Sequence, residues 1–198
     1  DRTSYVQGDV SDPKICQNII QNVIDTWGKL DILICNVGSG SSVSQGDETY
    51  DEWLKVLHQN FFSATNMIEA SKIELSKTHG NIVCISSISG LEYSGAPLTY
   101  ACAKTALNQY IKGISRPLSK QGIRINGVAP GNILFKNSVW EQKLKENPNK
   151  VNDFLKNEVA LGRLGTPEEI ANFVIFLSST KASFATGSIF VVDGGQVK

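Results

Sequence analysis

A tyrosine and a lysine stand four residues apart, at Tyr100 and Lys104. On a helix this spacing places both side chains on one face, so the ammonium lies near the phenol. A neighbouring positive charge favours the phenolate and lowers the pKa of a tyrosine, which can then exchange a proton with an alcohol or a carbonyl near neutral pH. The plain alternative is a surface tyrosine beside a solvated lysine, and the pair alone does not separate the two.

A serine follows a predicted buried strand. The apolar run Ile82–Ser86 predicts the strand, and Ser87 comes directly after it. In parallel sheets ligands bind beyond the carboxyl ends of the strands. A hydroxyl placed there could polarise a carbonyl and stabilise developing oxyanion charge. The alternative is a turn serine that caps the end of the strand.

The rest of the chain must position these residues, and it predicts alternating strands and helices. Helix starts are marked by Ser11 followed by Asp12-Pro13, and by capping boxes at Thr49 and Thr166. Alternation of this kind is typical of an α/β fold, here a Rossmann-like, doubly wound parallel sheet in one domain spanning 1–198. The β-rich or apolar runs predicted as strands are Thr3–Gln7, Asp31–Cys35, Ile82–Ser86, Ile123–Val128 and Ser188–Val192, and the longer helices cover about 50–77, 98–120 and 167–179.

Composition excludes several classes of function. The 198 residues carry 19 Lys+Arg against 19 Asp+Glu, which leaves no basic footprint for nucleic acid or an anionic membrane. No apolar run reaches the ~18 residues that a membrane span needs. The four cysteines form no CxxC pair, so we expect no metal site and a reducing, cytoplasmic location.

Several motifs in the same order make the sequence resemble the short-chain dehydrogenase/reductase family over essentially its whole length. Asn60, Ser87, Tyr100 and Lys104 match the catalytic tetrad of that family in order and spacing. The other matching motifs are Asp9-Val10, the Asn36-Val37-Gly38 turn, the Pro130-Gly131 turn and the closing Asp193-Gly194-Gly195.

The resemblance implies a role for each tetrad residue. Tyr100 would be the general acid/base, and Lys104 would lower its pKa and hydrogen-bond the nicotinamide ribose. Ser87 would orient and polarise the carbonyl. Asn60 would hold a water through a local distortion of its helix and so extend a proton relay, although it would otherwise read as an ordinary helix-surface amide.

The resemblance also implies a nicotinamide cofactor, NAD or NADP. The cofactor would carry out the hydride transfer, while the protein would supply the proton and orient the substrate. Asp9 would hydrogen-bond the adenine amino group, with Val10 packed nearby, and Ile133 would meet the carboxamide through its backbone. The choice between NAD and NADP is unreadable. The remaining residues implied as cofactor contacts are Asn36, Val37, Gly38, Tyr100, Lys104, Pro130 and Gly131.

The sequence departs from the family in one large respect. The glycine-rich phosphate turn, Thr-Gly-x-x-x-Gly-x-Gly, has no counterpart, and the match starts near the third family strand. We therefore expect an N-terminally incomplete domain that lacks the first two strands, from a parent of about 250 residues. The run around Tyr5 would then have no partner strand, and the strand at 31–35 would be an edge strand with unpaired backbone groups.

Smaller departures concern single side chains. Phe135 stands where many members carry a threonine that touches the carboxamide, which puts that contact in doubt. Cys35 replaces an asparagine and is interpreted as a small buried thiol or, alternatively, a reactive cysteine.

The segment 132–160 matches the substrate lid of the family. Its residues Phe135, Val139 and Trp140 could form an apolar wall or could merely pack the lid onto the domain. No sequence feature identifies the substrate, because the sequence resembles bacterial 3-oxoacyl-carrier-protein reductases and sugar or polyol dehydrogenases of the same family equally well. By resemblance we expect a homo-oligomer, a tetramer or dimer, built through the two long helices and the last helix and strand.

Two hypotheses for function follow. The first is an NAD(P)-dependent oxidoreductase that interconverts a carbonyl and an alcohol of a small molecule, with Tyr100 as acid/base. The second is a catalytically inactive fragment of the family that acts as a binding or assembly module. The intact tetrad favours the first, and the missing glycine turn favours the second.

Overall fold

Four parallel strands form the sheet in the computed structural model, which describes residues 3–197. They are β1 (Ile32–Cys35), β2 (Asn81–Ile85), β3 (Arg124–Pro130) and β4 (Ile189–Val192), paired in the order β1-β2-β3-β4. The predicted α/β architecture is confirmed. Four of the predicted strands lie within one or two residues of their expected bounds, and β3 extends to Pro130, which pairs with Val192.

The fifth predicted strand, Thr3–Gln7, is not formed. The segment has no regular structure, and the Tyr5 side chain is 93% exposed. β-rich residues become a strand only when their backbone groups have a partner strand, and none of the described strands lies beside this run. β1 is accordingly an edge strand, as the sequence predicted.

The helices follow the predicted order, with the long helix over 50–77 interrupted by a π-helical turn. The described helices are α1 (Pro13–Trp27), α2 (Tyr50–Leu57), the π turn His58–Phe62, α3 (Ser63–Thr78), α4 (Leu98–Ser119), α5 (Val139–Glu146), α6 (Pro148–Glu158), α7 (Pro167–Ser178) and the short 3-10 turns Ile88–Gly90 and Thr180–Ala182. No described helix is both long and apolar enough to cross a membrane.

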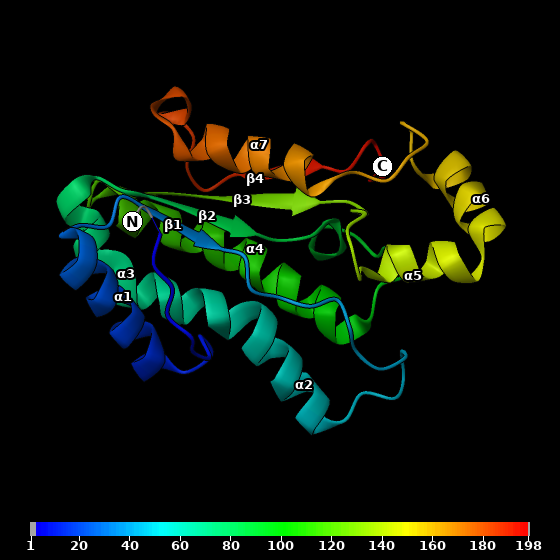
Figure 1. The fold of residues 1–198 in the computed structure, drawn as a ribbon, viewed down its shortest axis with the longest axis horizontal. Coiled ribbons are helices and arrows are strands. Elements are labelled where there is room, and N and C mark those ends of the chain that lie inside the picture. The colour runs from blue at the N-terminus through cyan, green and yellow to red at the C-terminus, as the bar shows by residue number, and fades with distance from the viewer. Residues whose placement is uncertain (1–2, 198) are drawn as a thin grey trace.

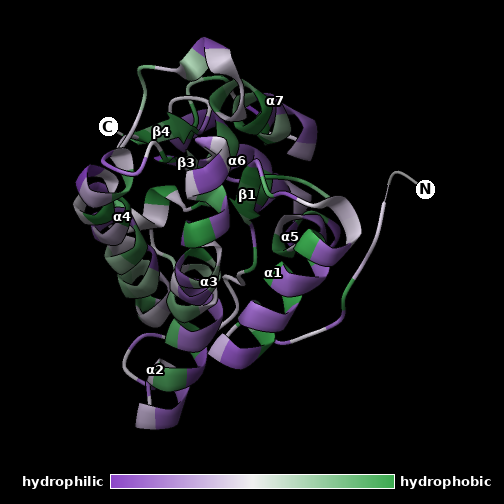
Figure 2. Cartoon of the chain, turned by 90° about the vertical axis from the view of Figure 1, so that its left-hand side faces the viewer, coloured by the Kyte–Doolittle hydropathy of each residue, from purple (hydrophilic) through white to green (hydrophobic). Residues whose placement is uncertain are grey.

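The two faces of the sheet are covered unequally (Figure 1). α3 and α4 pack on one face, while α7 covers the other around Leu177. The strands are largely apolar, whereas α1 shows a mixture of polar and apolar residues around its surface (Figure 2). Each fully buried Ile or Leu contributes about 1.5–3 kcal/mol, and the largest such residues of the first face are Ile68, Leu75, Ile82, Leu107, Ile111, Leu118, Ile123 and Ile125.

The predicted lid segment forms α5 and α6, which lie beyond the carboxyl ends of the strands (Figure 1). It has a small core of its own, in which Val151, Leu155 and Val159 are buried against Trp140 and Phe154. The lid is therefore held together partly by contacts within itself.

Side-chain caps begin the helices, with two corrections to the sequence prediction. The N-cap of α1 is Asp12, not Ser11, because the Asp12 carboxylate accepts from Lys14 N at 2.8 Å. Thr49 does cap α2, but the Glu52 carboxylate accepts from Ser42 Oγ at 2.9 Å instead of completing the box. The second box, from Thr166, is complete.

Removal of the Thr166 hydroxyl should loosen the start of α7. Thr166 Oγ1 accepts from Glu169 N at 3.3 Å, and the Glu169 carboxylate accepts from Thr166 N at 2.9 Å. We expect Thr166→Ala to lower the free energy of unfolding by about 1 kcal/mol and the Tm by about 2–4 °C. Thermal unfolding by circular dichroism measures this, with Thr3→Ala as the control in an exposed segment. Equal Tm values for the two variants would contradict the capping role.

Candidate active site

A cleft of about 530 Å³ opens at the carboxyl ends of the strands. Its walls come from the turns after β1, β2 and β3, from the first turns of α4 and from the lid. This is the position at which open parallel sheets bind ligands, and the volume lies within the range of small-molecule sites. Ser87, Tyr100 and Lys104 all line this cleft.

Tyr100 lies in the first turn of α4 and faces Ser87. Ser87 follows β2 and is buried, with its Oγ accepting from Ser89 N at 3.1 Å. Burial raises the pKa of Tyr100, and a side-chain hydrogen bond with Ser87 acts in the opposite direction. The phenol is therefore protonated at neutral pH. The sequence led us to expect a pKa lowered by Lys104, but burial is the largest influence on the pKa of Tyr100 and raises it. Lys104 Nζ lies 5.8 Å from the centroid of the Tyr100 ring.

Lys104 is nearly buried, with 3% of its surface exposed. Its Nζ donates to Ile85 O at 2.9 Å, at the end of β2. Burial lowers the pKa of Lys104 to about 8, and the nearby thiols of Cys84 and Cys35 act in the opposite direction. A cation in this position is held by the backbone of the sheet and not by a carboxylate.

Asn60 lies in the π turn between α2 and α3 and is 1% exposed. Its Nδ2 donates to Val56 O and to Ser39 O, both at 3.1 Å, and its Oδ1 accepts from Ser39 N at 3.0 Å. The expected helix distortion is present at Asn60. Both amide hydrogens are already donated to backbone oxygens, so Asn60 ties the turn after β1 to the helix.

Gly38 lies where that turn passes closest to the tetrad. A Cβ on Gly38 would stand 2.8 Å from Asn60 Oδ1 and 3.2 Å from Lys104 Nζ. Only a residue without a side chain lets the backbone approach both groups. The Gly38 position is thus required for the relative placement of Asn60 and Lys104.

The residues predicted to contact a cofactor fall into three groups. Asn36, Gly38, Pro130, Gly131 and Ile133 line the main cleft. Val10 and Val37 line an adjacent hollow of about 110 Å³, which Asn36 also borders.

Asp9 lines neither space. Its exposed carboxylate accepts from Ser11 N at 2.9 Å, which lowers the pKa of Asp9. Asp9 is therefore used in the turn that precedes α1, and the structure does not bring its carboxylate into the cleft.

The Pro130-Gly131 turn packs against the closing motif of the chain. A Cβ on Gly131 would stand 2.8 Å from Asp193 Cα. The Asp193 carboxylate in turn accepts from the backbone N–H groups of Gly195, Gln196 and Val197 at 2.7–3.1 Å. These contacts hold the end of β3 in place beside the cleft.

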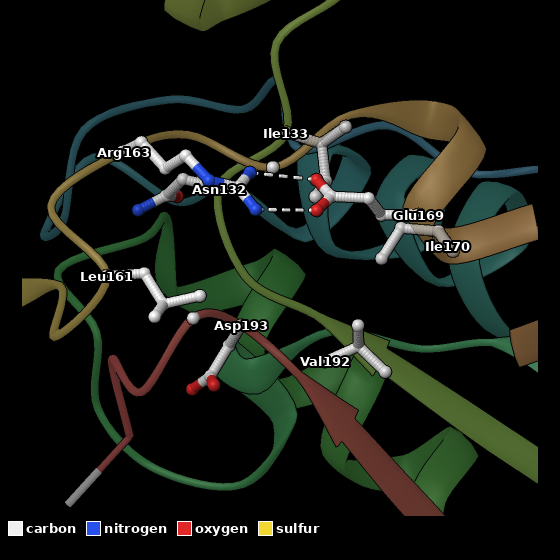
Figure 3. A pocket seen from close by; sticks show the side chains of 10 residues that line it. Asn132, Ile133, Leu161, Arg163, Glu169, Ile170, Val192 and Asp193 are labelled. Carbon is white, nitrogen blue, oxygen red and sulfur yellow. Dashed lines mark hydrogen bonds and ion pairs between the residues drawn. The ribbon is translucent and has the colours of Figure 1, made fainter. Parts of the chain in front are cut away.

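A further hollow of about 100 Å³ lies next to that turn (Figure 3). Arg163 and Glu169 form a two-pronged ion pair at 2.9 and 2.7 Å across it, which lowers the pKa of Glu169 to about 2. On the same side Ile133 forms a parallel bridge with Gly165. The bridge ties the start of the lid to the segment that follows the lid, and the ion pair ties that segment to the first turn of α7.

Some residues of the site were not predicted from the sequence. Ser42 Oγ bonds Thr99 Oγ1 at 2.7 Å and ties the loop after β1 to the start of α4. Asn132 accepts from Trp140 Nε1 at 3.0 Å and donates to Gln196 Oε1 at 2.8 Å. Two of these contacts, Ser42 with Thr99 and Asn132 with Gln196, join residues that are far apart in the sequence, so no local pattern predicts them.

The cleft suits one end of a dinucleotide. Among the described residues that line it there is no aspartate or glutamate, while Lys104 uses one of its three ammonium donors on Ile85 O. Gly38 and Gly131 bring backbone close to the cavity without side chains. These features fit a nicotinamide and its ribose beside Tyr100.

Comparison with known proteins identifies a family and relatives that the chain resembles. The family described as Enoyl-(Acyl carrier protein) reductase matches residues 1–196. The 3-oxoacyl-[acyl-carrier-protein] reductase of Chlamydia muridarum is 34% identical over 98% of this chain and 77% of its own length. The L-rhamnose 1-dehydrogenase (NAD(P)(+)) of a Sphingomonas strain is 31% identical over 98% of this chain and 76% of its own length.

A solved structure shares the fold. The structure of ElxO with NADP bound has a TM-score of 0.89 and 27% identity, covering 98% of this chain and 77% of that one. The chain thus spans about three quarters of the length of the proteins it matches. On the family match, these identities and the shared fold, the chain belongs to the short-chain dehydrogenase/reductase family of NAD(P)-dependent oxidoreductases.

Proposed function

We propose that this oxidoreductase interconverts a carbonyl and an alcohol of a small molecule, with Tyr100 as the general acid/base. The observation that carries the proposal is that Tyr100, Ser87 and the buried ammonium of Lys104 line one cleft, with Lys104 Nζ 5.8 Å from the centroid of the Tyr100 ring. A protonated phenol, a hydroxyl donor and a fixed cation suffice to bind a carbonyl oxygen and to give it a proton.

Each side chain takes one part in that reaction. In reduction, the Ser87 hydroxyl donates to the carbonyl oxygen, and the Tyr100 hydroxyl gives it a proton as negative charge develops there. Lys104 stabilises the phenolate that remains, because opposite charge favours the ionised form. Asn60 is a positioning residue that holds the turn at Ser39 against the helix.

The cofactor is NAD or NADP. When bound, its nicotinamide supplies the hydride in reduction and accepts it in oxidation. The residues placed to hold it are Asn36, Gly38, Pro130, Gly131 and Ile133 along the cleft, and Val10 and Val37 at the adjacent hollow. Lys104 has donors left for the hydroxyls of the ribose.

A homo-oligomer stays a prediction, and one observation supports it. The last helix and strand, with the turn between them, carry uncovered apolar side chains. Phe184 is fully exposed, and the exposed fractions are 66% for Ile175, 44% for Phe176 and 43% for Val191.

Removal of the Tyr100 hydroxyl tests the proposed function directly. We expect Tyr100→Phe to lower the kcat of ketone reduction by about a hundredfold to ten-thousandfold, because the proton donor is lost. Binding of NADH or NADPH, followed by nicotinamide fluorescence, should change by less than about twofold, because the fold and the cleft remain.

Tyr93→Phe is the matched control, since Tyr93 is 73% exposed and donates to Gln45 on the surface. A Tyr100→Phe variant as active as Tyr93→Phe would refute the acid/base role. A folded chain that binds neither nucleotide and reduces no ketone would instead support the inactive binding module.

The pKa of Lys104 predicts an alkaline limit to activity. Because burial brings this pKa to about 8, the ammonium loses its proton as the pH rises through that value. We expect kcat/KM for reduction to fall above a pH of about 8. The Lys104→Met variant should be slow at every pH and should show no such decline in rate. A rate profile from roughly pH 6 to 10 measures it, and a wild-type profile without the limb would contradict the role of the cation.

A methyl group at Gly38 should displace the side chains of Asn60 and Lys104. Gly38→Ala places a Cβ against Asn60 Oδ1 and Lys104 Nζ, and we expect kcat to fall about tenfold to hundredfold as these groups shift. In Gly40→Ala the nearest heavy atom, Tyr100 Cζ, is 4.0 Å away, so activity should remain. Steady-state kinetics of the Gly38→Ala and Gly40→Ala variants measure this difference. Equal losses of kcat would show that the loop tolerates no substitution at all, and would contradict a specific requirement for close approach at Gly38.

A further inference from the structure

The lid presents a lysine beside two aromatic rings to the cleft. Trp140 and Lys143 of α5 and Phe154 of α6 line the same cavity as Tyr100. The rings of Trp140 and Phe154 stack with centroids 5.1 Å apart, and Lys143 Nζ lies 4.5 Å from the centroid of the Trp140 ring. The hydrogen bond from Trp140 Nε1 to Asn132 fixes the indole in place. The wall is thus an oriented apolar surface with a cation at its edge.

The charge of Lys143 is not neutralised by a carboxylate. Within residues 3–197 no ion pair involves Lys143. The carboxylates beside it on α5 have other partners, since Glu141 pairs with Lys145 at 3.1 Å and Glu146 accepts from Gln142 at 2.7 Å. The Lys143 side chain is exposed, so its ammonium can reach a group in the cleft.

The charged residues that line the cleft also favour an anionic ligand. Of the described lining residues, Lys104 and Lys143 are cationic and none is acidic. Lys104 is buried next to Tyr100, where the proposed function places the reacting end of the substrate. Lys143 lines the same cleft from α5 of the lid, and we place the remote end of the substrate there.

We propose that the substrate is an anionic carbonyl compound, whose carboxylate or phosphate is bound by Lys143 while its apolar part contacts Trp140 and Phe154. This inference rests on the proposed function, because it takes the carbonyl to lie at Tyr100 and Ser87. It makes Lys143 a specificity-determining residue. Its ammonium would form charge-assisted hydrogen bonds to the anion, and the apolar rings beside it would strengthen these bonds by lowering the local dielectric constant.

Binding of matched ketones tests the inference. The probes are para-acetylbenzoate, para-acetylphenyl phosphate and the neutral methyl ester of the benzoate, titrated calorimetrically into the full chain. Wild type should bind at least one anion about tenfold more tightly than the ester, and Lys143→Gln should lose that preference while Lys143→Arg keeps it. The stronger anion identifies a carboxylate or a phosphate as the recognised group.

Lys145→Gln is the matched control, because it removes the same charge from the same helix at a residue that does not line the cleft. It should bind all three probes as wild type does. An equal loss of anion and ester binding in Lys143→Gln would overturn the inference in favour of a packing role on Trp140, as would a wild type without preference for either anion.

The same probes separate this inference from the proposed function. Reduction of the ester that depends on Tyr100, with no effect of Lys143 on anion binding, would leave the proposed function standing and overturn the inference. Anion binding that depends on Lys143, with no reduction of any probe, would support the anion site and refute the proposed function.

Discussion

The buried ammonium of Lys104 is the constraint around which the site is built. A charge at 3% exposure is costly unless hydrogen bonds hold it, and here the carbonyl of Ile85 at the end of β2 does so. α4 must therefore run close to β2, and a Cβ on Gly90 would stand 2.7 Å from the Lys104 carbonyl carbon. The turn after β1 also passes close to this ammonium, because a Cβ on Gly38 would stand 3.2 Å from Lys104 Nζ and 2.8 Å from Asn60 Oδ1.

One physical cause, desolvation, sets the protonation of both central residues. It raises the pKa of Tyr100 and lowers that of Lys104 to about 8. The phenol therefore keeps its proton near neutral pH, as its proposed role of proton donor requires. A cleft arranged in this way favours proton donation, and it fits the oxidoreductase family to which the chain belongs.

The two ends of the cleft differ in how they are held. The reacting end is built from strand ends and from the first turns of α4, on the large core of the sheet. The other end is a lid with a small core of its own, attached through Ile133, Asn132 and the Arg163–Glu169 pair. The proposed chemistry thus lies on the end built on the large core, while the proposed specificity residue Lys143 lies on the lid with its separate small core.

The sequence by itself determined the alternating elements, the edge position of β1, the caps at Thr49 and Thr166 and the shared face of Tyr100 and Lys104, because these follow from local periodicity and from resemblance. The roles implied for the tetrad stay predictions. Only the tertiary structure decided that Thr3–Gln7 forms no strand, that Asp9 lies outside the cleft, that the pKa of Tyr100 is raised and that Lys143 faces the cavity. Strand pairing, desolvation and cavity lining depend on residues far apart in the chain, which no local pattern encodes.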